Sequence, residues 1–221
     1  LLAPRPGMQL AVSSDMLVEG RHFFAGVDPR TLGHKALAVN LSDVAAMGAR
    51  PLGFCLGLMV PPDLPEEFFD RLLAGMAELA GRHGVGLAGG DLSAAASLGL
   101  SVTAWGERAA GGRFLTRRAA RPGDRLFVVG PVGLARAGLT VLERHGREAA
   151  GRWPEATRAH LRPDARVADG PRLAGIGGVR GLMDLSDGLA RDLPRFLGEL
   201  GADLAPEAAA RSEEHTSELQ S

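Results

Sequence analysis

The sequence predicts a mixed α/β protein of the α+β type. Short apolar runs bounded by glycine, proline or acidic residues alternate along the chain with longer segments of helical periodicity. With 221 residues, of which 45% are apolar, the chain is long enough for one large or two small domains with hydrophobic cores. The net charge of −1 gives no electrostatic reason to expect nucleic acid or a membrane as a partner. We also expect no signal peptide and no membrane helix, since no apolar run approaches about 20 residues.

The first elements are justified by alternation and by helix-start signals. Weak alternation of apolar and polar residues predicts a strand at Gln9–Ser14, and a second, short strand is expected near His22–Phe24. Asp28 and the proline after it begin a helix that runs to Gly48. A break in this helix near Asn40 is left open.

The next elements have clearer start and stop signals. The apolar run Leu52–Val60 predicts a buried strand. A helix is expected at Glu66–His83, because a proline and two acids form its first turn and Gly84 follows its end. Val85–Ala88 and Leu98–Glu107 are expected to be strands.

Arginine, glycine and proline accumulate at Gly111–Gly123, which makes this stretch the best candidate for a domain boundary. Beyond it, the pattern predicts strands at Arg125–Val129 and Gly181–Met183. Four helices are expected, near Leu134–Glu143, Trp153–Leu161, Val167–Ala174 and Gly188–Leu200.

Aspartates flanked by small residues stand at the edges of several of these elements. They are Asp15, Asp43, Asp91 and the pair Asp184 and Asp187. Hard cations such as magnesium take oxygen ligands and bridge a few carboxylates to substrate phosphates. Two carboxylates about 4 Å apart repel by roughly 4 kcal/mol at an effective dielectric of 20, and cations relieve that repulsion. We therefore predict a shared acidic pocket that holds divalent cations and serves phosphoryl transfer.

Each aspartate also has a structural explanation that the residues alone leave open. Asp15 would end a strand in a turn, and Asp43 would lie in the first turn of a restarted helix. The two glycines before Asp91 would form a simple turn. Asp184 would cap the last helix, with Asp187 in its first turn, and capping is compatible with metal binding.

Lys35 is the only lysine, so the chain has no GxxxxGK[ST] loop. Phosphate charge would have to be met by metal, arginine or backbone N–H groups. Cys55 lies in an apolar run and is expected to be a buried structural thiol, which is compatible with the reducing cytoplasm.

Five stretches together resemble the motif set of the thiamine-monophosphate kinases. They are AVSSDMLVEGRHF, LGHKALAVNLSDVAAMGARP, LAGGD, FLTRRAARPGDRLFVVG and MDLSDGLARDL, and the match runs in order from about Ala11 to Gly201. These kinases belong to the superfamily of aminoimidazole ribonucleotide synthetase and selenophosphate synthetase. LVEGRHF with LSDVAAMGA is specific for the kinase, whereas LAGGD or SDGL alone would be shared with its relatives. The resemblance implies an AIR-synthetase-like two-domain fold whose N-terminal sheet pairs across a homodimer.

The resemblance also implies a reaction and its site. ATP would phosphorylate thiamine monophosphate to thiamine diphosphate by direct in-line transfer, with several Mg²⁺ ions and without a nucleophile or base from the protein, in the cytoplasm. The implied metal ligands are Ser13, Ser14, Asp15, Asp43, Asp91, Asp184 and Asp187. The implied ATP-binding residues are Gly90, Asp91, Arg117 and Ser186, and His22 would face the substrate.

Three parts are expected along the chain. Residues 1–115 would form an N-terminal ATP- and metal-binding, dimerising domain, and residues 116–210 an incomplete C-terminal α+β domain. Residues 211–221 break in composition and read like a translated sequencing adapter, the alternative being a charged terminal helix. The family's GDD and GGEDYEL motifs are not in the chain, so we expect a piece truncated at both ends that is inactive by itself. Two alternatives stay open for the function: a sibling ATP-using enzyme of the superfamily, and a non-enzymatic nucleotide-binding module.

Overall fold

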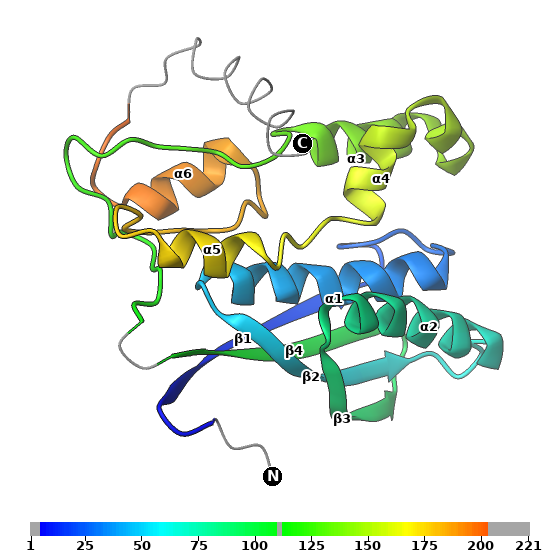
Figure 1. Ribbon diagram of the computed structural model, residues 1–221. Helices are drawn as coiled ribbons and strands as arrows, with labels where there is room; N and C mark the ends of the chain where they lie inside the picture. Colours follow the sequence, from blue (N-terminus) through cyan, green and yellow to red (C-terminus); the bar gives the residue numbers. More distant parts are fainter. Residues whose placement is uncertain (1–4, 110–111, 203–221) are drawn as a thin grey trace, which may run out of the picture.

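The computed structural model, which describes residues 5–109 and 112–202, is built on a four-stranded sheet with helices on one side (Figure 1). The strands are β1 (Met8–Val18), β2 (Arg50–Val60), β3 (Gly86–Ala94) and β4 (Gly99–Ala109). Their order in the sheet is β1-β4-β2-β3. The strand β4 pairs antiparallel with both β1 and β2, and β3 pairs parallel with β2.

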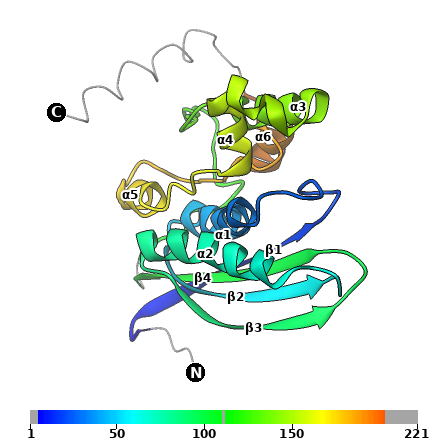
Figure 2. The same ribbon diagram turned by 90° about the vertical axis from the view of Figure 1, so that its right-hand side faces the viewer.

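Two long helices, α1 (Pro29–Ala46) and α2 (Glu66–His83), cover one face of this sheet (Figure 2). The start of α1 is capped as expected, because Asp28 Oδ2 accepts a hydrogen bond of 2.9 Å from the N–H of Thr31. The helix continues through Asn40 without a break. The side chain of this buried asparagine donates to Ala36 O at 3.0 Å, one turn back. The expected helix Glu66–His83 is confirmed to the residue and ends at Gly84 in the left-handed conformation, with φ 63°.

The core lies between the sheet and these helices. Leu37, Leu41 and Val44 of α1 meet Leu100 and Val102 of the central strand, and all five are 0% exposed. Fully burying a leucine or valine side chain contributes about 1.5–3 kcal/mol, so this layer carries much of the stability.

The helices α1 and α2 pack closely because glycine lies at each side of their contact. A Cβ atom on Gly33 would lie 2.0 Å from Leu72 O, and one on Gly75 would lie 1.9 Å from Arg30 O. Any larger residue at either position would push the two helices apart.

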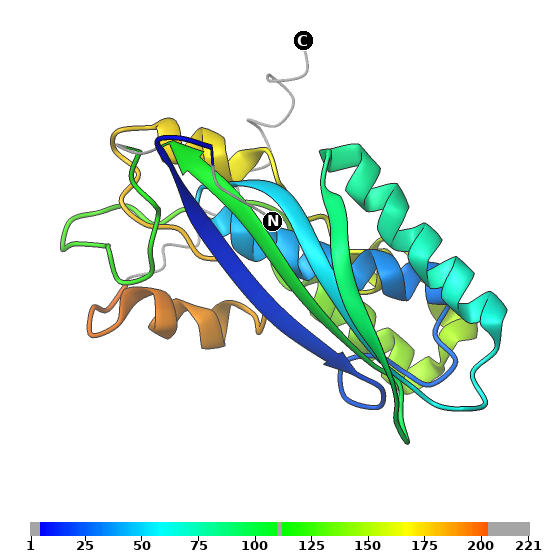
Figure 3. The ribbon, with the colours of Figure 1, turned by 90° about the horizontal axis from the view of Figure 1, so that it is seen from below.

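The opposite face of the sheet is covered by no element among the described residues, as the view from below shows (Figure 3). On β1 this face exposes the large apolar residues Leu10, Val12 and Met16.

The rest of the described chain is helical or irregular. It holds α3 (Leu134–His145), a 3₁₀ turn η1 (Arg147–Arg152), α4 (Pro154–Leu161), α5 (Asp169–Gly175) and α6 (Leu189–Leu197). The four expected helices are therefore present, with small differences at their ends. None of the helices in the described ranges is long and apolar enough to cross a membrane.

Three expected strands are wrong. Arg125–Val129 and Gly181–Met183 have no strand partner among the described residues, and a strand forms only where a ladder of hydrogen bonds is available. Phe127 is accordingly 79% exposed. The segment His22–Phe24 forms only an isolated bridge between Glu19 and Phe23.

Candidate metal and nucleotide site

The first part of the candidate site joins β1 to α1. Alternate residues of β1 face α1, and Ser13 Oγ donates to Asp43 Oδ2 at 2.5 Å. The backbone N–H of Asp15 donates to Asn40 Oδ1 at 3.1 Å. Asp43 lies three residues after Asn40, on the same side of the helix. Two residues of β1 are thus held against two residues of α1 around the carboxylate of Asp43.

The expectation that Asp15 ends its strand is wrong. The strand β1 continues to Val18, with Asp15 in register with Val102 of β4. Ser14 points to the other face of the sheet, where its Oγ lies 2.8 Å from Thr103 Oγ1. The side chain of Ser14 therefore points away from Asp43. Only the backbone of Ser14, which joins Ser13 to Asp15, lies close to the acidic residues.

Asp184 brings the C-terminal segment to the same place. It lies in the irregular segment between α5 and α6, and its pKa is raised to about 6 by burial and by the negative charge and contact of Asp43. Arg117 acts in the opposite direction on this pKa, so its guanidinium lies near Asp184. Burial and Asp43 also raise the pKa of Asp15. The structure therefore brings Asp15, Asp43 and Asp184, from three distant segments, into one electrostatic group.

Asp91 does not join this group within the chain. It lies inside β3, in register with Gly57 of β2 and through it with Ser101 of β4, on the sheet face that points away from α1. Two strands separate β3 from β1. The expected convergence of Asp91 with the other aspartates is thus not seen, because the register puts it on the other face. The one hydrogen bond to its side chain among the described residues is from Ser93 Oγ to Asp91 Oδ2, at 3.4 Å.

The glycines before Asp91 belong to the sheet and do not form a turn. A Cβ atom on Gly90 would lie 1.9 Å from Leu56 O, so only glycine allows β3 to approach β2 here. The register between β2 and β3 shifts at this point, between Phe54 and Cys55. Gly90 therefore has a structural cause that is independent of any nucleotide.

The segment that carries Ser186 and Asp187 is held by Asp192, which sequence reasoning missed. The backbone N–H groups of Asp187 and Gly188 donate to Asp192 Oδ2 at 2.8 and 3.0 Å. Arg195 Nη1 donates to Asp192 Oδ1 at 3.1 Å and to Asp187 Oδ2 at 2.5 Å.

The expected capping of this helix by Asp184 is wrong. The helix α6 begins at Leu189 after Gly188, and Asp192, 1% exposed, binds the N–H groups ahead of it. The acid four residues into the helix was the signal, one position beyond the usual capping box.

The expected nucleotide residues Arg117 and Ser186 are exposed. The backbone N–H of Arg118 donates to Phe196 O at 2.8 Å, which ties the segment of Arg117 to α6. Arg117, Ser186 and Asp184 therefore come from two segments that contact each other, while Gly90 lies on the distant strand β3.

His22 lies beside this site and is fixed at its backbone and ring. Its Nδ1 accepts a hydrogen bond of 3.0 Å from the N–H of Val18, so a neutral ring carries its proton on Nε2. His22 is exposed, and a protonated ring here would act on Asp15 to lower that group's pKa. The imidazole is thus held near the acidic group with an N–H available to a ligand.

The donor set fits a divalent cation in its chemistry. Three interacting carboxylates, two with a raised pKa, form a concentration of negative charge that a hard cation would neutralise. In the part of the chain that the structure describes, no three His, Cys, Asp or Glu side chains are arranged so that they could hold a metal ion by themselves. A cation here would take further oxygens, such as those of Ser13, the backbone or a substrate phosphate.

Comparison with known proteins finds a family model and relatives that match this chain. The family model described as AIR synthase related protein, N-terminal domain, matches residues 1–107. The chain is 38% identical to the thiamine-monophosphate kinase of Escherichia coli (strain K12) over 186 residues, which are 83% of this chain and 55% of that protein.

Two solved structures extend the likeness to three dimensions. The thiamine-monophosphate kinase of Stenotrophomonas maltophilia K279a has a TM-score of 0.80 and 36% identity, covering 96% of this chain and 64% of that one. AaThiL complexed with AMPPCP and TMP has a TM-score of 0.81 and 32% identity, covering 88% of this chain and 61% of that one.

The chain belongs to the AIR synthase-related family. The three relatives named above are thiamine-monophosphate kinases, and the chain spans between 55% and 64% of their length. The expected fold class is confirmed by these neighbours.

Proposed function

We propose that this chain is the nucleotide- and metal-binding part of a kinase that transfers the γ-phosphoryl group of ATP to thiamine monophosphate, giving thiamine diphosphate and ADP. The relatives support the reaction, and the complex of AaThiL with AMPPCP and TMP supports both substrates. The observation that carries the proposal in this chain is the group of Asp15, Asp43 and Asp184, placed beside Arg117. Phosphoryl transfer needs such a site for charge rather than a nucleophile.

In this mechanism the protein positions charged groups and performs no covalent step. Magnesium held by Asp15, Asp43 and Asp184 would supply charge neutralisation for the phosphates. Ser13 fixes the orientation of Asp43 by its hydrogen bond. Arg117 binds nucleotide phosphate with a guanidinium that keeps its charge. The acceptor phosphate is already anionic near neutral pH, so its oxygen attacks the γ-phosphorus without a general base, and His22 offers its Nε2–H to the acceptor.

Four roles remain proposals that geometry within one chain supports less directly. Ser14 would contribute only backbone oxygen to a metal, because its hydroxyl faces Thr103. Asp187 is paired with Arg195 and would have to leave it to bind a cation. Gly90 and Asp91 would act only if their face of the sheet met further structure. The exposed side chain of Ser186 is free to approach a nucleotide.

A homodimer formed through the uncovered sheet face is part of the proposal. The face exposes Leu10, Val12 and Met16 of β1, and a second copy would cover them in an isologous contact. Asp91 lies on the same face, so its role would depend on that second copy. We expect light scattering to give the mass of a dimer at micromolar concentration. A monomer there would contradict this part of the proposal.

The domain boundary near residue 115 and the cytoplasmic location also remain proposals. Residues 1–115 would bind metal and dimerise, and residues 116–210 would complete the nucleotide site. The described residues end at 202, so the expected tail at 211–221 lies outside them.

The decisive experiment is a substitution in a full-length protein that contains this chain. Asp43→Asn should abolish magnesium-dependent ADP release with thiamine monophosphate and leave the fold intact. Asp63→Asn, which changes an exposed aspartate in the loop before α2, is the matched control and should keep the rate. An Asp43→Asn protein with an unchanged rate would contradict the proposal.

A further inference from the structure

The single lysine of the chain occupies the contact between three segments. Lys35 lies in α1, and its Nζ donates to the carbonyl oxygen of His22 at 3.2 Å. The same Nζ lies 3.4 Å from Nε2 of His160, at the end of α4. An ammonium group has only donors, so the imidazole of His160 must accept this bond and carry its own proton on Nδ1.

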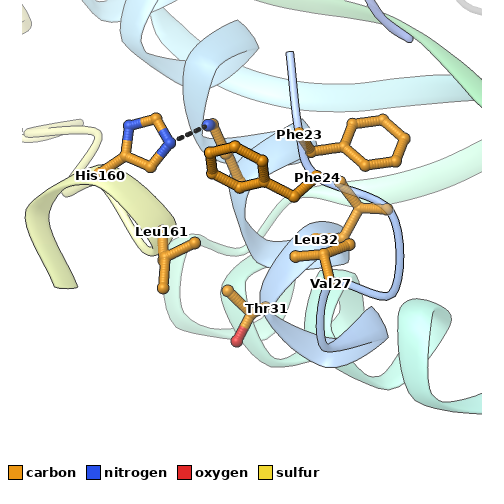
Figure 4. A pocket seen from close by; sticks show the side chains of 8 residues that line it. Phe23, Phe24, Val27, Thr31, Leu32, His160 and Leu161 are labelled. Carbon is orange, nitrogen blue, oxygen red and sulfur yellow. Dashed lines mark hydrogen bonds between the residues drawn. The ribbon is translucent and has the colours of Figure 1, made fainter. Parts of the chain in front are cut away.

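The surroundings keep this pair in that state. A small pocket closes around the lysine stem, lined by Phe23, Phe24, Val27, Thr31, Leu32, His160 and Leu161 (Figure 4). Burial lowers the pKa of Lys35 to about 8. Burial and the charges of Lys35 and Arg136 lower the pKa of His160 to about 4. His160 is therefore neutral at neutral pH and remains an acceptor, while Lys35 remains mostly a donor.

The bond from Lys35 completes the fixation of His22. The N–H of His22 donates to Val18 O at 2.9 Å, and its ring Nδ1 accepts from the N–H of Val18. These two contacts tie His22 to the end of β1, and within the described ranges only the hydrogen bond from Lys35 ties it to α1. The lysine therefore fixes the backbone of His22, and the bond from Val18 sets the direction of the ring on that backbone.

The residue before Lys35 holds the same distant segment from its other side. His34 Nε2 donates to Pro163 O at 3.0 Å, and its Nδ1 lies 3.4 Å from the guanidinium nitrogens of Arg82 and Arg162. Two consecutive residues of α1 thus grip the segment 160–163. The loop with His22 and the segment 160–163 are therefore both held by the same two residues of α1, His34 and Lys35.

We propose that Lys35 is a positioning residue that sets the acceptor-binding loop, by holding the His22 carbonyl with an ammonium group anchored on neutral His160. This inference rests on the proposed function, because His22 faces the acceptor only in that reaction. Lys35 itself touches neither the carboxylate group nor the nucleotide residues. Its loss should therefore affect the acceptor and spare ATP.

The first test uses nuclear magnetic resonance and needs no catalysis. Since Lys35 is the only lysine, ¹⁵N labelling of lysine Nζ gives one side-chain signal from this chain. Lys35→Met keeps the length of the stem and removes the donor, and it should shift the ring signals of His22 and His160. The His22 signal is assigned with His22→Gln. Arg30→Met is the matched control, because it removes a cation from the same helix that pairs with Glu78 instead. It should leave both ring signals in place.

The second test is kinetic and uses the full-length protein. Lys35→Met should raise the KM for thiamine monophosphate about tenfold or more, the effect of losing a hydrogen bond to a charged group. The KM for ATP should change less than about twofold, within the ordinary scatter of a remote change. Lys35→Arg keeps a charged donor and should recover most of the loss.

The outcomes separate the two hypotheses. Unshifted His22 signals in Lys35→Met, or equal changes in both KM values, would overturn the positioning role. A failure of Lys35→Arg to recover any of the loss would also count against it. A wild-type full-length protein without phosphorylation of thiamine monophosphate would overturn the proposed function, while the spectra would still decide whether Lys35 sets His22.

Discussion

The two halves of the described chain differ in how far their apolar residues are buried. In the sheet half, residues 5–109, the side chains of Leu41 and Leu100 are 0% exposed between helix and strand. In residues 112–202, Phe127 is 79% exposed and Ile176 is 54% exposed. Both halves also expose apolar side chains, such as Val12 and Met16 on the uncovered face of the sheet. The difference lies in the core, because the first half closes one between its sheet and helices, and among the described residues the second half adds only Ala165 to that buried cluster. Regular structure follows burial, since the expected strands survive only where the core is closed.

The largest expected effect tests this difference directly. Leu100→Ala empties a fully buried position on the central strand and should lower the free energy of unfolding by about 2–5 kcal/mol. Phe127→Ala removes a larger side chain and should cost less than about 0.5 kcal/mol, because it loses little burial. Urea denaturation of the two variants measures both. Similar losses for the two would break the comparison.

A smaller effect is expected at the carboxylate that organises the second half. Asp192→Ala leaves the N–H groups of Asp187 and Gly188 without their acceptor, which should cost about 1–3 kcal/mol. The loss should be local to α6 and the segment before it. Amide hydrogen exchange should therefore speed up there and stay unchanged in the core of β4. A uniform increase over both regions would show that the two halves unfold as one unit.

A further effect, which depends on pH, is expected where the halves meet, at Lys35. Its folded-state pKa of about 8 is below the ordinary lysine value of 10.5, because burial disfavours the charged form. Between these two values the unfolded chain binds more protons than the folded one, so stability should rise as the pH increases through this window. Between about pH 7 and about pH 10, the urea midpoint of the wild type should therefore rise relative to the midpoint of Lys35→Met. Midpoints that change in parallel would contradict the burial of this amine.

Local signals predicted the elements well and the faces poorly. The helix Glu66–His83 was found to the residue because its acids, proline and glycine all lie within its own ends. The strands β1 and β3 run farther than predicted, through Asp15 and Asp91, because pairing with β4 and β2 extends them. Alternation cannot show such pairing, since it is decided by residues far away in the sequence.

The candidate site shows the same division. The aspartates themselves could be selected from the sequence, as could the serine beside Asp15. Their grouping could not, because the register of β1 and β3 decides that Asp15 faces α1 and Asp91 does not. Asp192 and Lys35 were missed for another reason. Each acts by holding another residue, and the residue it holds becomes visible only in the folded chain.

The strand order β1-β4-β2-β3 also has a consequence for the time at which this sheet can exist. The strand β4 is the last of the four to leave the ribosome, yet it lies in the middle and pairs with both β1 and β2. Met8 can pair with Ala109 only after about a hundred further residues have been synthesised, and contacts between residues so far apart in the sequence form slowly. During that wait β1 has no neighbour, and the apolar strand β2 can pair only with β3. The nascent chain therefore passes through a period in which one edge of β2, its most apolar strand, is unpaired. The rate at which β4 pairs with that edge sets how long the chain is prone to aggregation.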